Sequence, residues 1–307
     1  MSAMRIRLAA LRPLNHPRSH SPFKLLVLPL VMKVDLSIDD ELARQLERLV
    51  DGKSFSSIAD IAQLYLDESL RKSTIRQAVV LAGGKGSRLR PITHEMPKPM
   101  VPFRGKPLLA HVIEMLRKNG IFDITIAAGY KAAAILNHFG DGSRFGVSLR
   151  YVVEDEPLGT AGALKLTKQH LTGPFVVTNA DELKDFDLQP LFALHASTKA
   201  IGTIALTKVD DPSAYGIAHL EDTRILRFVE KPSDAFSNLA NAGLYVVSPK
   251  IFDFIPDGFS MTETDVFPVL ARSNALHGLH LEGQWFDTGT LDRYEQALKE
   301  WKGFTFR

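Results

Sequence analysis

Three glycines within four positions follow a short apolar run, and a loop of this kind can hold a phosphate group. The stretch reads Leu81-Ala82-Gly83-Gly84-Lys85-Gly86-Ser87-Arg88-Leu89. Glycines let backbone N–H groups approach a bulky anion, because no side chain stands between them. The pattern is not that of a dinucleotide-binding loop, which needs a glycine where Leu89 stands, nor that of a P-loop. By glycine spacing alone, a purely structural turn explains the loop equally well.

Two basic residues beside this loop favour phosphoryl chemistry. Lys98 lies between Pro97 and Pro99, which restrict the backbone on both sides and remove local hydrogen-bond donors. Its ammonium group is therefore held in one place. Together with Arg88 at the end of the loop, it provides the fixed positive charge on which catalysis at a phosphoryl group depends.

The longer stretch that contains both features resembles the signature of the sugar nucleotidyltransferases, also called NDP-sugar pyrophosphorylases. It reads LAGGKGSRLRPITHEMPKPMVPFRGKPLL, with Ser87 where the family usually has threonine and Ala180, further along, where it usually has glycine. The resemblance covers residues 77–307. It continues through Leu158-Gly159-Thr160-Ala161-Gly162, Asn179-Ala180-Asp181, Val229-Glu230-Lys231-Pro232, Asn241-Ala242-Gly243 and Trp285-Phe286-Asp287-Thr288-Gly289.

The resemblance implies transfer of a nucleoside monophosphate from an NTP to a sugar 1-phosphate, with release of pyrophosphate and with Mg²⁺ as cofactor. It implies that Arg88, Lys98 and Asp181 are catalytic, and that Asp181 and Asp287 hold the Mg²⁺ through their carboxylates. The nucleotide site implied by the family motifs comprises Leu81, Ala82, Gly83, Gly84, Gly86, Ser87, Glu154, Gly159 and Thr160. The implied sugar-phosphate site comprises Gly216, Glu230, Lys231 and Asn241.

Glu154 favours GTP as the nucleotide. It lies five residues before Gly159, where the family contacts the base. A carboxylate only accepts hydrogen bonds, and guanine offers N1–H and a 2-amino group on one edge. Residues 154–162 are similar to mannose-1-phosphate and heptose-1-phosphate guanylyltransferases. The alternatives are a uridylyl- or thymidylyltransferase acting on glucose 1-phosphate or an amino sugar phosphate, and a regulatory DNA-binding protein with a sugar-nucleotide sensor domain.

The sequence pattern around these residues predicts an α/β fold from residue 76 to residue 307. Apolar strands alternate with amphipathic helices, which indicates a Rossmann-like, mostly parallel sheet sandwiched by helices. Strands are expected at 78–81, 123–127, 149–153 and 175–178, and helices at 108–118, 131–139 and 161–168. Strand-like segments at 201–206, 217–220, 225–228 and 244–247 predict a mixed sheet region for the second substrate. A last helix is expected from Leu291 to Trp301.

Residues 32–75 predict a small β-α-α module. A strand at 33–38 is followed by a helix that starts at Asp39 or Asp40, and by a second helix from about residue 56 to Lys72. This order resembles the ribbon-helix-helix fold. Seven basic and nine acidic residues between 32 and 76 do not make the basic surface that DNA binding needs. We therefore expect either a homodimer through this module or a helical hairpin packed on the catalytic domain.

Composition bounds the remaining possibilities. Cysteine is absent, which excludes disulfides and thiol nucleophiles and fits a cytoplasmic protein. The formal net charge of +2 argues against nucleic acid as a partner. The apolar run at 23–31 is shorter than the roughly 20 residues that cross a bilayer, so no membrane association is expected. We expect residues 1–31 to be a disordered leader, with Met32 as the first residue of the working protein.

Overall fold

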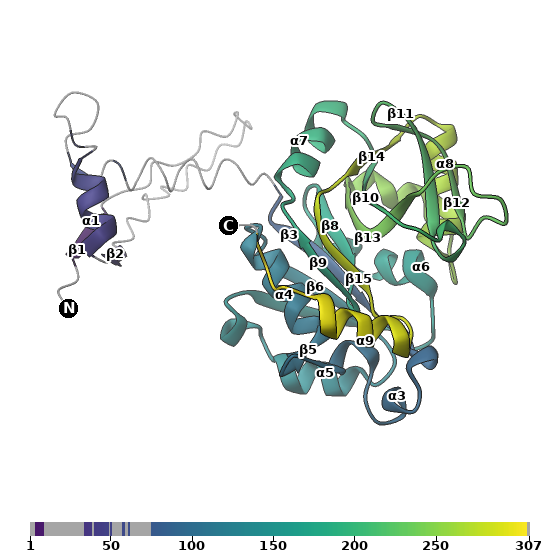
Figure 1. Ribbon diagram of the computed structural model, residues 1–307, viewed down its shortest axis with the longest axis horizontal. Coiled ribbons are helices and arrows are strands. Elements are labelled where there is room, and N and C mark those ends of the chain that lie inside the picture. Colours follow the sequence, from purple (N-terminus) through teal and green to yellow (C-terminus); the bar gives the residue numbers. More distant parts are fainter. Residues whose placement is uncertain are drawn as a thin grey trace, which may run out of the picture. The chain divides into compact units, whose positions relative to one another are not determined.

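The computed structural model describes residues 4–8, 34–38, 40–48, 50, 57–58, 61 and 75–305. The chain divides into two compact units, Met1–Lys72 and Ser73–Arg307 (Figure 1). Within the described residues, no helix is both long enough and apolar enough to cross a membrane.

The N-terminal unit contains the expected strand and first helix. They are β2 (Val34–Ile38) and α1 (Asp40–Glu47). Within residues 1–31, which are expected to be a leader, the structure has a strand, β1 (Met4–Leu8), that pairs antiparallel with β2 and places Met4 opposite Ile38. The sequence of β1, MRIRL, alternates apolar and basic residues with the period of a strand. The rest of the expected leader and most of the second helix lie outside the described residues, and the ribbon-helix-helix module and its homodimer stay predictions.

A nine-stranded mixed sheet forms the centre of the C-terminal unit. Its order is β10-β14-β12-β11-β13-β8-β3-β6-β7, with a further pairing of β10 and β13. Strands β8, β3, β6 and β7 are parallel, as expected. The other half is mixed, because β10 pairs parallel with β14 and antiparallel with β13, and β11 pairs antiparallel with β12. The bounds are β3 (Gln77–Ala82), β6 (Asp123–Ala128), β7 (Ser148–Val153), β8 (Phe175–Asn179), β10 (Gly202–Lys208), β11 (Gly216–Glu221), β12 (Arg224–Glu230), β13 (Leu239–Val247) and β14 (Leu276–His280).

Helices cover both faces of this sheet. Alternate residues of β3 belong to different hydrophobic clusters, because successive side chains of a strand point to opposite faces. On one face Ala78 and Val80 pack in the cluster of α4 (Leu108–Lys118), α5 (Ala132–Phe139) and α7 (Gln189–Thr198). On the other, Val79 packs in the cluster of α6 (Gly159–Leu166) and α8 (Phe267–Arg272). The predicted α/β sandwich is confirmed.

Smaller elements complete the unit. Two-residue strands β4 (Pro102–Phe103) and β5 (Lys106–Pro107) form one hairpin. Strands β9 (Glu182–Phe186) and β15 (Gly283–Asp287) pair antiparallel as a separate two-stranded sheet. Helix α3 (Ile92–Glu95) follows the glycine loop, and α9 (Leu291–Glu300) follows β15. The sequence patterns predicted α9 but not β9 or β15.

Buried His195 makes the stability of this unit depend on pH. Its side chain is 5% exposed, and Nδ1 lies 2.9 Å from Thr203 Oγ1. Burial lowers the pKa of His195 from 6.5 to about 4. Because the folded state has the lower pKa, His195 contributes stability that is complete above pH 6.5 and is lost as the pH falls towards 4.

Replacing His195 with glutamine is therefore expected to make stability less sensitive to acid. Between about pH 7.5 and about pH 5, the wild type should lose about 2 kcal/mol more of its unfolding free energy than His195→Gln. Urea unfolding of both proteins at the two pH values measures this difference. Equal losses in the two proteins would show that His195 takes up no proton on unfolding.

Candidate active site

A cavity of about 480 Å³ lies at the carboxyl ends of the parallel strands. The residues that follow β3, β7 and β8 line it, namely Gly83, Glu154 and Asp181. We call it the main cavity. An adjoining cavity of about 280 Å³ is lined by residues of the glycine loop and shares Arg88, Lys98 and Asp181 with the main cavity. In open α/β sheets, ligands bind at this end of the strands.

Every site residue expected from the sequence lines one or both cavities. The main cavity includes Leu81, Gly83, Gly84, Arg88, Lys98, Glu154, Gly159, Thr160, Asp181, Gly216, Glu230, Lys231, Asn241 and Asp287. The adjoining cavity adds Ala82, Gly86 and Ser87. The structure thus brings all of them together, although their chemical roles stay predictions.

Close neighbours leave no room for a side chain at two of the three loop glycines, Gly83 and Gly86. A Cβ atom at Gly83 would lie 2.0 Å from Glu154 Oε1, and one at Gly86 would lie 2.8 Å from Lys98 Cβ. Gly86 also has a φ of +61°, which favours glycine. The loop is further fixed by Thr93, whose Oγ1 donates to the Gly86 carbonyl over 2.8 Å. The loop therefore lies directly against Glu154 and Lys98.

Lys98 and Asp181 form a mostly buried ion pair. Lys98 Nζ lies 2.5 Å from Asp181 Oδ2, and the lysine side chain is 9% exposed. Burial of the Asp181 carboxyl acts to raise its pKa, but the charge of Lys98, helped by that of Lys184, outweighs burial and holds the pKa below its usual value. Asp181 is therefore ionised at neutral pH.

Asp287 reaches the same cavity from a distant segment. In the β9–β15 ladder it lies opposite Glu182, the residue after Asp181. Thr288 Oγ1 donates to the Asp181 carbonyl over 2.6 Å, which ties the two segments together. Arg293 of α9 places its Nη1 2.5 Å from Asp287 Oδ2. The two aspartates therefore line one cavity, as a shared divalent ion requires.

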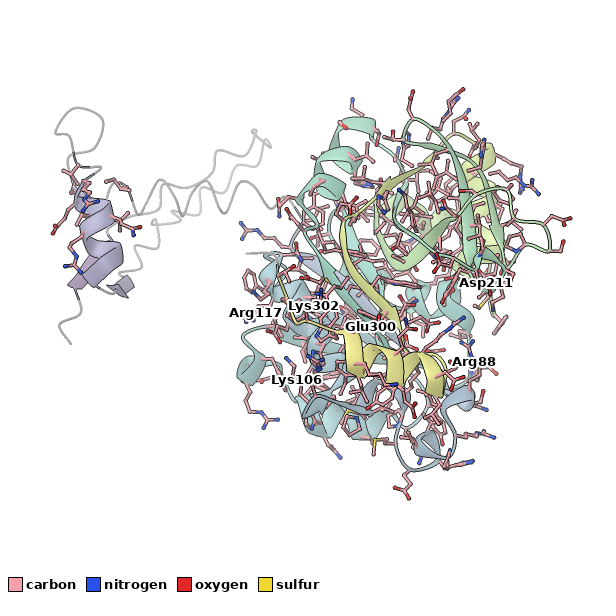
Figure 2. The ribbon with its side chains drawn as sticks, viewed as in Figure 1. Arg88, Lys106, Arg117, Asp211, Glu300 and Lys302 are labelled. Carbon is pink, nitrogen blue, oxygen red and sulfur yellow. The ribbon has the colours of Figure 1, made fainter. Side chains whose placement is uncertain are left out.

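Arg88 lies beside this group. A Cβ atom at Gly289 would lie 2.7 Å from Asp287 Oδ1 and 3.2 Å from Arg88 Nη2. Figure 2 shows the same placement, with Arg88 near the start of α9. A side chain at residue 289 would thus force the carboxylate and the guanidinium apart.

The carboxylates fit a magnesium ion that completes its coordination with substrate. Asp181 and Asp287 offer oxygen ligands, which Mg²⁺ prefers, and two carboxylates plus phosphate oxygens and water are a common set. Among the residues that the structure describes, no three His, Cys, Asp or Glu side chains are grouped closely enough to hold a metal. A site built by protein ligands alone is therefore not formed in this part of the chain.

Glu154 presents an acceptor to the cavity. Its Oε2 accepts a hydrogen bond from Leu158 N over 2.9 Å, which fixes the carboxylate, and Oε1 faces Gly83. Burial raises the pKa of Glu154, and the Leu158 bond opposes this only in part. The carboxylate is thus oriented beside the glycine loop.

The opposite part of the main cavity holds the expected sugar-phosphate residues. Lys231 Nζ lies 3.5 Å from Glu230 Oε1, and Asn241 Oδ1 accepts from Gly243 N over 3.0 Å. A Cβ atom at Gly216 would lie 2.7 Å from Glu230 Oε2. Burial, together with the charge of Glu263, raises the pKa of Glu230. This part of the cavity is polar and acidic.

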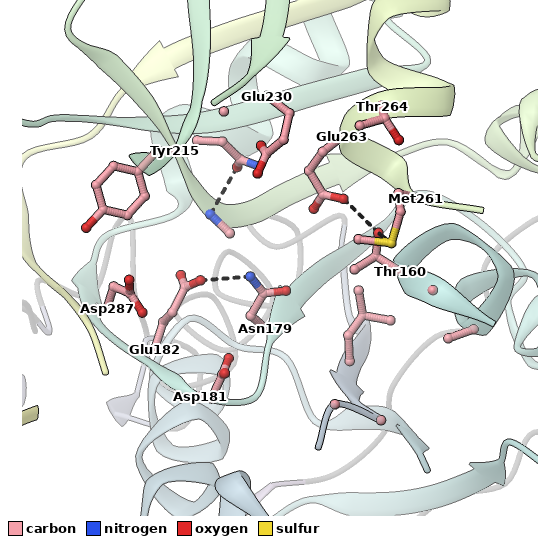
Figure 3. A pocket seen from close by; sticks show the side chains of 18 of the residues that line it. Thr160, Asn179, Asp181, Glu182, Tyr215, Glu230, Met261, Glu263, Thr264 and Asp287 are labelled. Atoms are coloured by element: carbon pink, nitrogen blue, oxygen red, sulfur yellow. Dashed lines mark hydrogen bonds between the residues drawn. The ribbon is translucent and has the colours of Figure 1, made fainter. Parts of the chain in front are cut away.

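Several residues of the cavity were missed by sequence reasoning. They are Glu182, Tyr215, Met261, Glu263, Thr264 and Trp285, most of which are labelled in Figure 3. Trp285 belongs to a quoted motif and Glu182 directly follows one, so proximity to a motif was a usable signal. Glu263 had no such signal. It reaches the site because Thr160 Oγ1 donates to its Oε2 over 2.7 Å, across a hundred residues of sequence.

Known proteins are similar to this chain in fold and sequence. The mannose-1-phosphate guanyltransferase of Candida albicans is 41% identical to this chain over 220 residues. The match covers 69% of this chain and 61% of the Candida albicans protein, so this chain spans about three fifths of the length of that relative. A Bacillus anthracis protein provisionally named a glucose-1-phosphate thymidylyltransferase, solved in complex with a sucrose, is 29% identical with a TM-score of 0.69, covering 75% of this chain and 97% of that one. HddC from Yersinia pseudotuberculosis, complexed with GMP-PN, is 28% identical with a TM-score of 0.64, covering 74% of this chain and 100% of that one.

A family model agrees with these similarities. The model described as nucleotidyl transferase matches residues 77–302. This range contains every residue that lines the two cavities. Because the match takes in well over half of the sequence, the chain belongs to the nucleotidyl transferase family.

Proposed function

We propose that the C-terminal unit transfers a guanylyl group from GTP to a sugar 1-phosphate of the mannose 1-phosphate type, giving a GDP-sugar and pyrophosphate. One observation carries this proposal. The glycine loop, the cations Arg88 and Lys98, and the carboxylates Asp181 and Asp287 share two adjoining cavities in a nucleotidyl transferase fold. A triphosphate with a divalent ion is the ligand that uses all of them.

In this proposal the chain positions two anions for in-line displacement. The glycine loop, Arg88 and Lys98 hold the triphosphate, and Lys231 with the backbone of Gly216 holds the sugar phosphate. A sugar-phosphate oxygen, already ionised, forms a bond to the α-phosphorus as the bond to pyrophosphate breaks, so no side-chain base is required. Mg²⁺ held by Asp181 and Asp287 would neutralise phosphate charge. Most of the catalysis is positioning and electrostatic stabilisation.

Glu154 supports guanine as the base. Its fixed carboxylate presents only acceptors, which match the N1–H and 2-amino donors of guanine. The Candida albicans relative is named a guanyltransferase, and the HddC structure contains GMP-PN. The thymidylyltransferase name of the Bacillus anthracis structure favours the alternative, a thymidylyl- or uridylyltransferase that uses glucose 1-phosphate.

Pyrophosphate release over a grid of nucleotides and sugar phosphates tests the proposal. GTP, UTP, dTTP and ATP are each combined with mannose 1-phosphate, glucose 1-phosphate and glucosamine 1-phosphate, in the presence of Mg²⁺. The expected maximum is GTP with mannose 1-phosphate. A maximum with UTP or dTTP would move the assignment to the alternative, and no release with any pair would refute sugar-nucleotide formation. Withholding Mg²⁺ from the productive pair tests the cofactor.

Replacing Glu154 with glutamine is expected to weaken selection for GTP. Glutamine turns one of two acceptors into a donor, which then faces a guanine donor, so kcat/KM for GTP should fall about tenfold or more. The value for UTP should change little, because uracil offers both donor and acceptor groups. The matched control is Asp155→Asn, an exposed neighbour outside both cavities. An unchanged GTP to UTP ratio would remove Glu154 from base recognition.

A further inference from the structure

The wall of the main cavity formed by β9 and β15 carries a charge pair that none of the roles above uses. In this ladder Glu182 lies opposite Asp287, and Lys184 lies opposite Trp285. Directly opposed residues and residues two apart project from the same face, so the four side chains share one face. Glu182, Trp285 and Asp287 line the cavity, and Lys184 lies behind them.

Lys184 is a buried cation that lies close to the carboxylate of Glu182. Its side chain is 1% exposed, and Nζ lies 3.0 Å from Glu182 Oε2. Within the described residues Nζ makes no hydrogen bond, so the pair is held by charge rather than by hydrogen-bond geometry. A buried ammonium group is costly unless it is paired. Lys184 and Glu182 therefore fix each other in the wall of the cavity.

Glu182 has acceptor capacity left on the cavity side. Its Oε1 accepts from Asn179 Nδ2 over 2.8 Å, and its Oε2 accepts from Trp285 Nε1 over 3.3 Å and contacts Lys184. Two carboxylate oxygens offer about four acceptor positions, so one position on Oε1 is unused by these contacts. The side chain is 14% exposed and lines the cavity, where Figure 3 shows it beside Asn179.

The location of Glu182 points to the sugar rather than the metal. Both carboxylate oxygens of Glu182 are already held by protein donors, Oε1 by Asn179 Nδ2 and Oε2 by Trp285 Nε1, whereas the proposed Mg²⁺ ligands are Asp181 and Asp287. Glu182 instead packs against Gly243. A Cβ atom there would lie 2.5 Å from Glu182 Oε2 and 2.4 Å from Asn179 Nδ2. The absence of a side chain at Gly243 thus lets Glu182 lie next to the segment that carries Asn241.

We propose that Glu182 accepts a hydrogen bond from a hydroxyl group of the sugar 1-phosphate, and that Lys184 is a positioning residue that holds Glu182 in place for it. The proposal rests on the proposed function and narrows its sugar class. Glu230 and Glu263 also line the cavity, and Lys231, which lies close to Glu230, partly offsets their charge. Sugars that present hydroxyl groups to this wall are accepted, and sugars that present a carboxylate, such as uronic acid phosphates, are rejected by charge.

Three variants of the full chain test the pair, namely Glu182→Gln, Lys184→Met and the double variant. Glu182→Gln is expected to raise the KM for mannose 1-phosphate about tenfold or more, while the KM for GTP stays within about twofold. Lys184→Met should also raise the KM for mannose 1-phosphate. The double variant should resemble Glu182→Gln alone, because Lys184 acts through Glu182 and the effects are not additive. A purely structural role would move both KM values or neither.

Deoxy sugars identify the hydroxyl group that Glu182 contacts. The monodeoxy analogues of mannose 1-phosphate are assayed with the wild type and with Glu182→Gln. For one analogue, kcat/KM with the wild type should be about tenfold lower than for mannose 1-phosphate. With Glu182→Gln, the same analogue and mannose 1-phosphate should have similar values of kcat/KM. Mannuronic acid 1-phosphate should be a poor substrate for the wild type and should improve relative to mannose 1-phosphate in Glu182→Gln.

The double variant keeps the test valid if a single variant unfolds. It removes both charges and preserves side-chain volume, a change that buried ion pairs often tolerate. A folded double variant with an unchanged KM for mannose 1-phosphate would overturn the proposal. If the wild type transfers no nucleotide, the proposed function is refuted. Calorimetric titration of mannose 1-phosphate into the wild type and the double variant then tests the Glu182 contact by itself. Tighter binding by the wild type supports the Glu182 contact, and equal or absent binding refutes it.

Discussion

Replacing Asp181 with asparagine is expected to lower kcat by about a hundredfold or more, with the fold intact. Asparagine has the same shape but no charge, so it loses both the attraction for a divalent cation and the ion pair with Lys98. The variant leaves Lys98, whose side chain is 9% exposed, without this partner, so some stability is lost, but the 31% exposure of the Asp181 side chain lets water reach the altered site and limits that loss. Pyrophosphate release at saturating substrate measures kcat, and circular dichroism checks the fold.

The matched control for this variant is Asp187→Asn. Asp187 is exposed, lies outside both cavities and accepts a local hydrogen bond from Gln189 N. It should retain wild-type kcat. Near-wild-type turnover by Asp181→Asn would mean that this carboxylate holds no ion needed for the reaction, and the two-aspartate site would have to be abandoned.

Replacing Lys98 with alanine is expected to lower kcat about as much as Asp181→Asn, but for a different reason. The ammonium group is held by the flanking prolines and by Asp181, and is thus preorganised for the charge that develops on the α-phosphate and on departing pyrophosphate. Removing one preorganised charge of this kind lowers kcat by about a hundredfold or more. The same pyrophosphate assay gives kcat and the KM for the nucleotide.

Lys85→Ala is the control for Lys98. Lys85 belongs to the glycine loop but is exposed and lines neither cavity, so its loss should change kcat little. Equal effects of the two substitutions would indicate a general need for positive charge near the loop. A fall confined to Lys98→Ala would support its specific contact with the phosphates.

Much of the site was predictable because its residues stand in short local motifs. The loop at 83–86 and the proline-flanked Lys98 stand out by their own residue types, and Asp181 and Asp287 are identified through the family motifs that contain them. The strands of the parallel half and helix α4 were also located, since their side-chain periodicity reflects burial on one or both faces. Local pattern was sufficient wherever a residue's role depends on its immediate neighbours.

Strands β9 and β15 show why other elements escaped prediction. Their sequences, ELKDF and GQWFD, carry charged and polar residues where a buried strand normally has apolar ones. Lys184 and Asp185 are nevertheless buried. Glu182, on the same strand, pairs with Lys184 by charge, whereas Asp185 accepts hydrogen bonds from Gln284 and Thr305, which belong to distant segments. A local pattern contains no information about such partners.

The sequence by itself determined the family motifs, the α/β alternation and the set of residues that could bind a phosphorylated ligand. Only the tertiary structure decided that Asp287 lies opposite Glu182, that Arg293 pairs with Asp287, and that Thr160 holds Glu263. Periodicity records which side of an element is buried, whereas these contacts depend on how strands far apart in the chain are ordered and aligned. Strand order and register are settled by packing the whole core, and the charge pairs of the cavity follow from them.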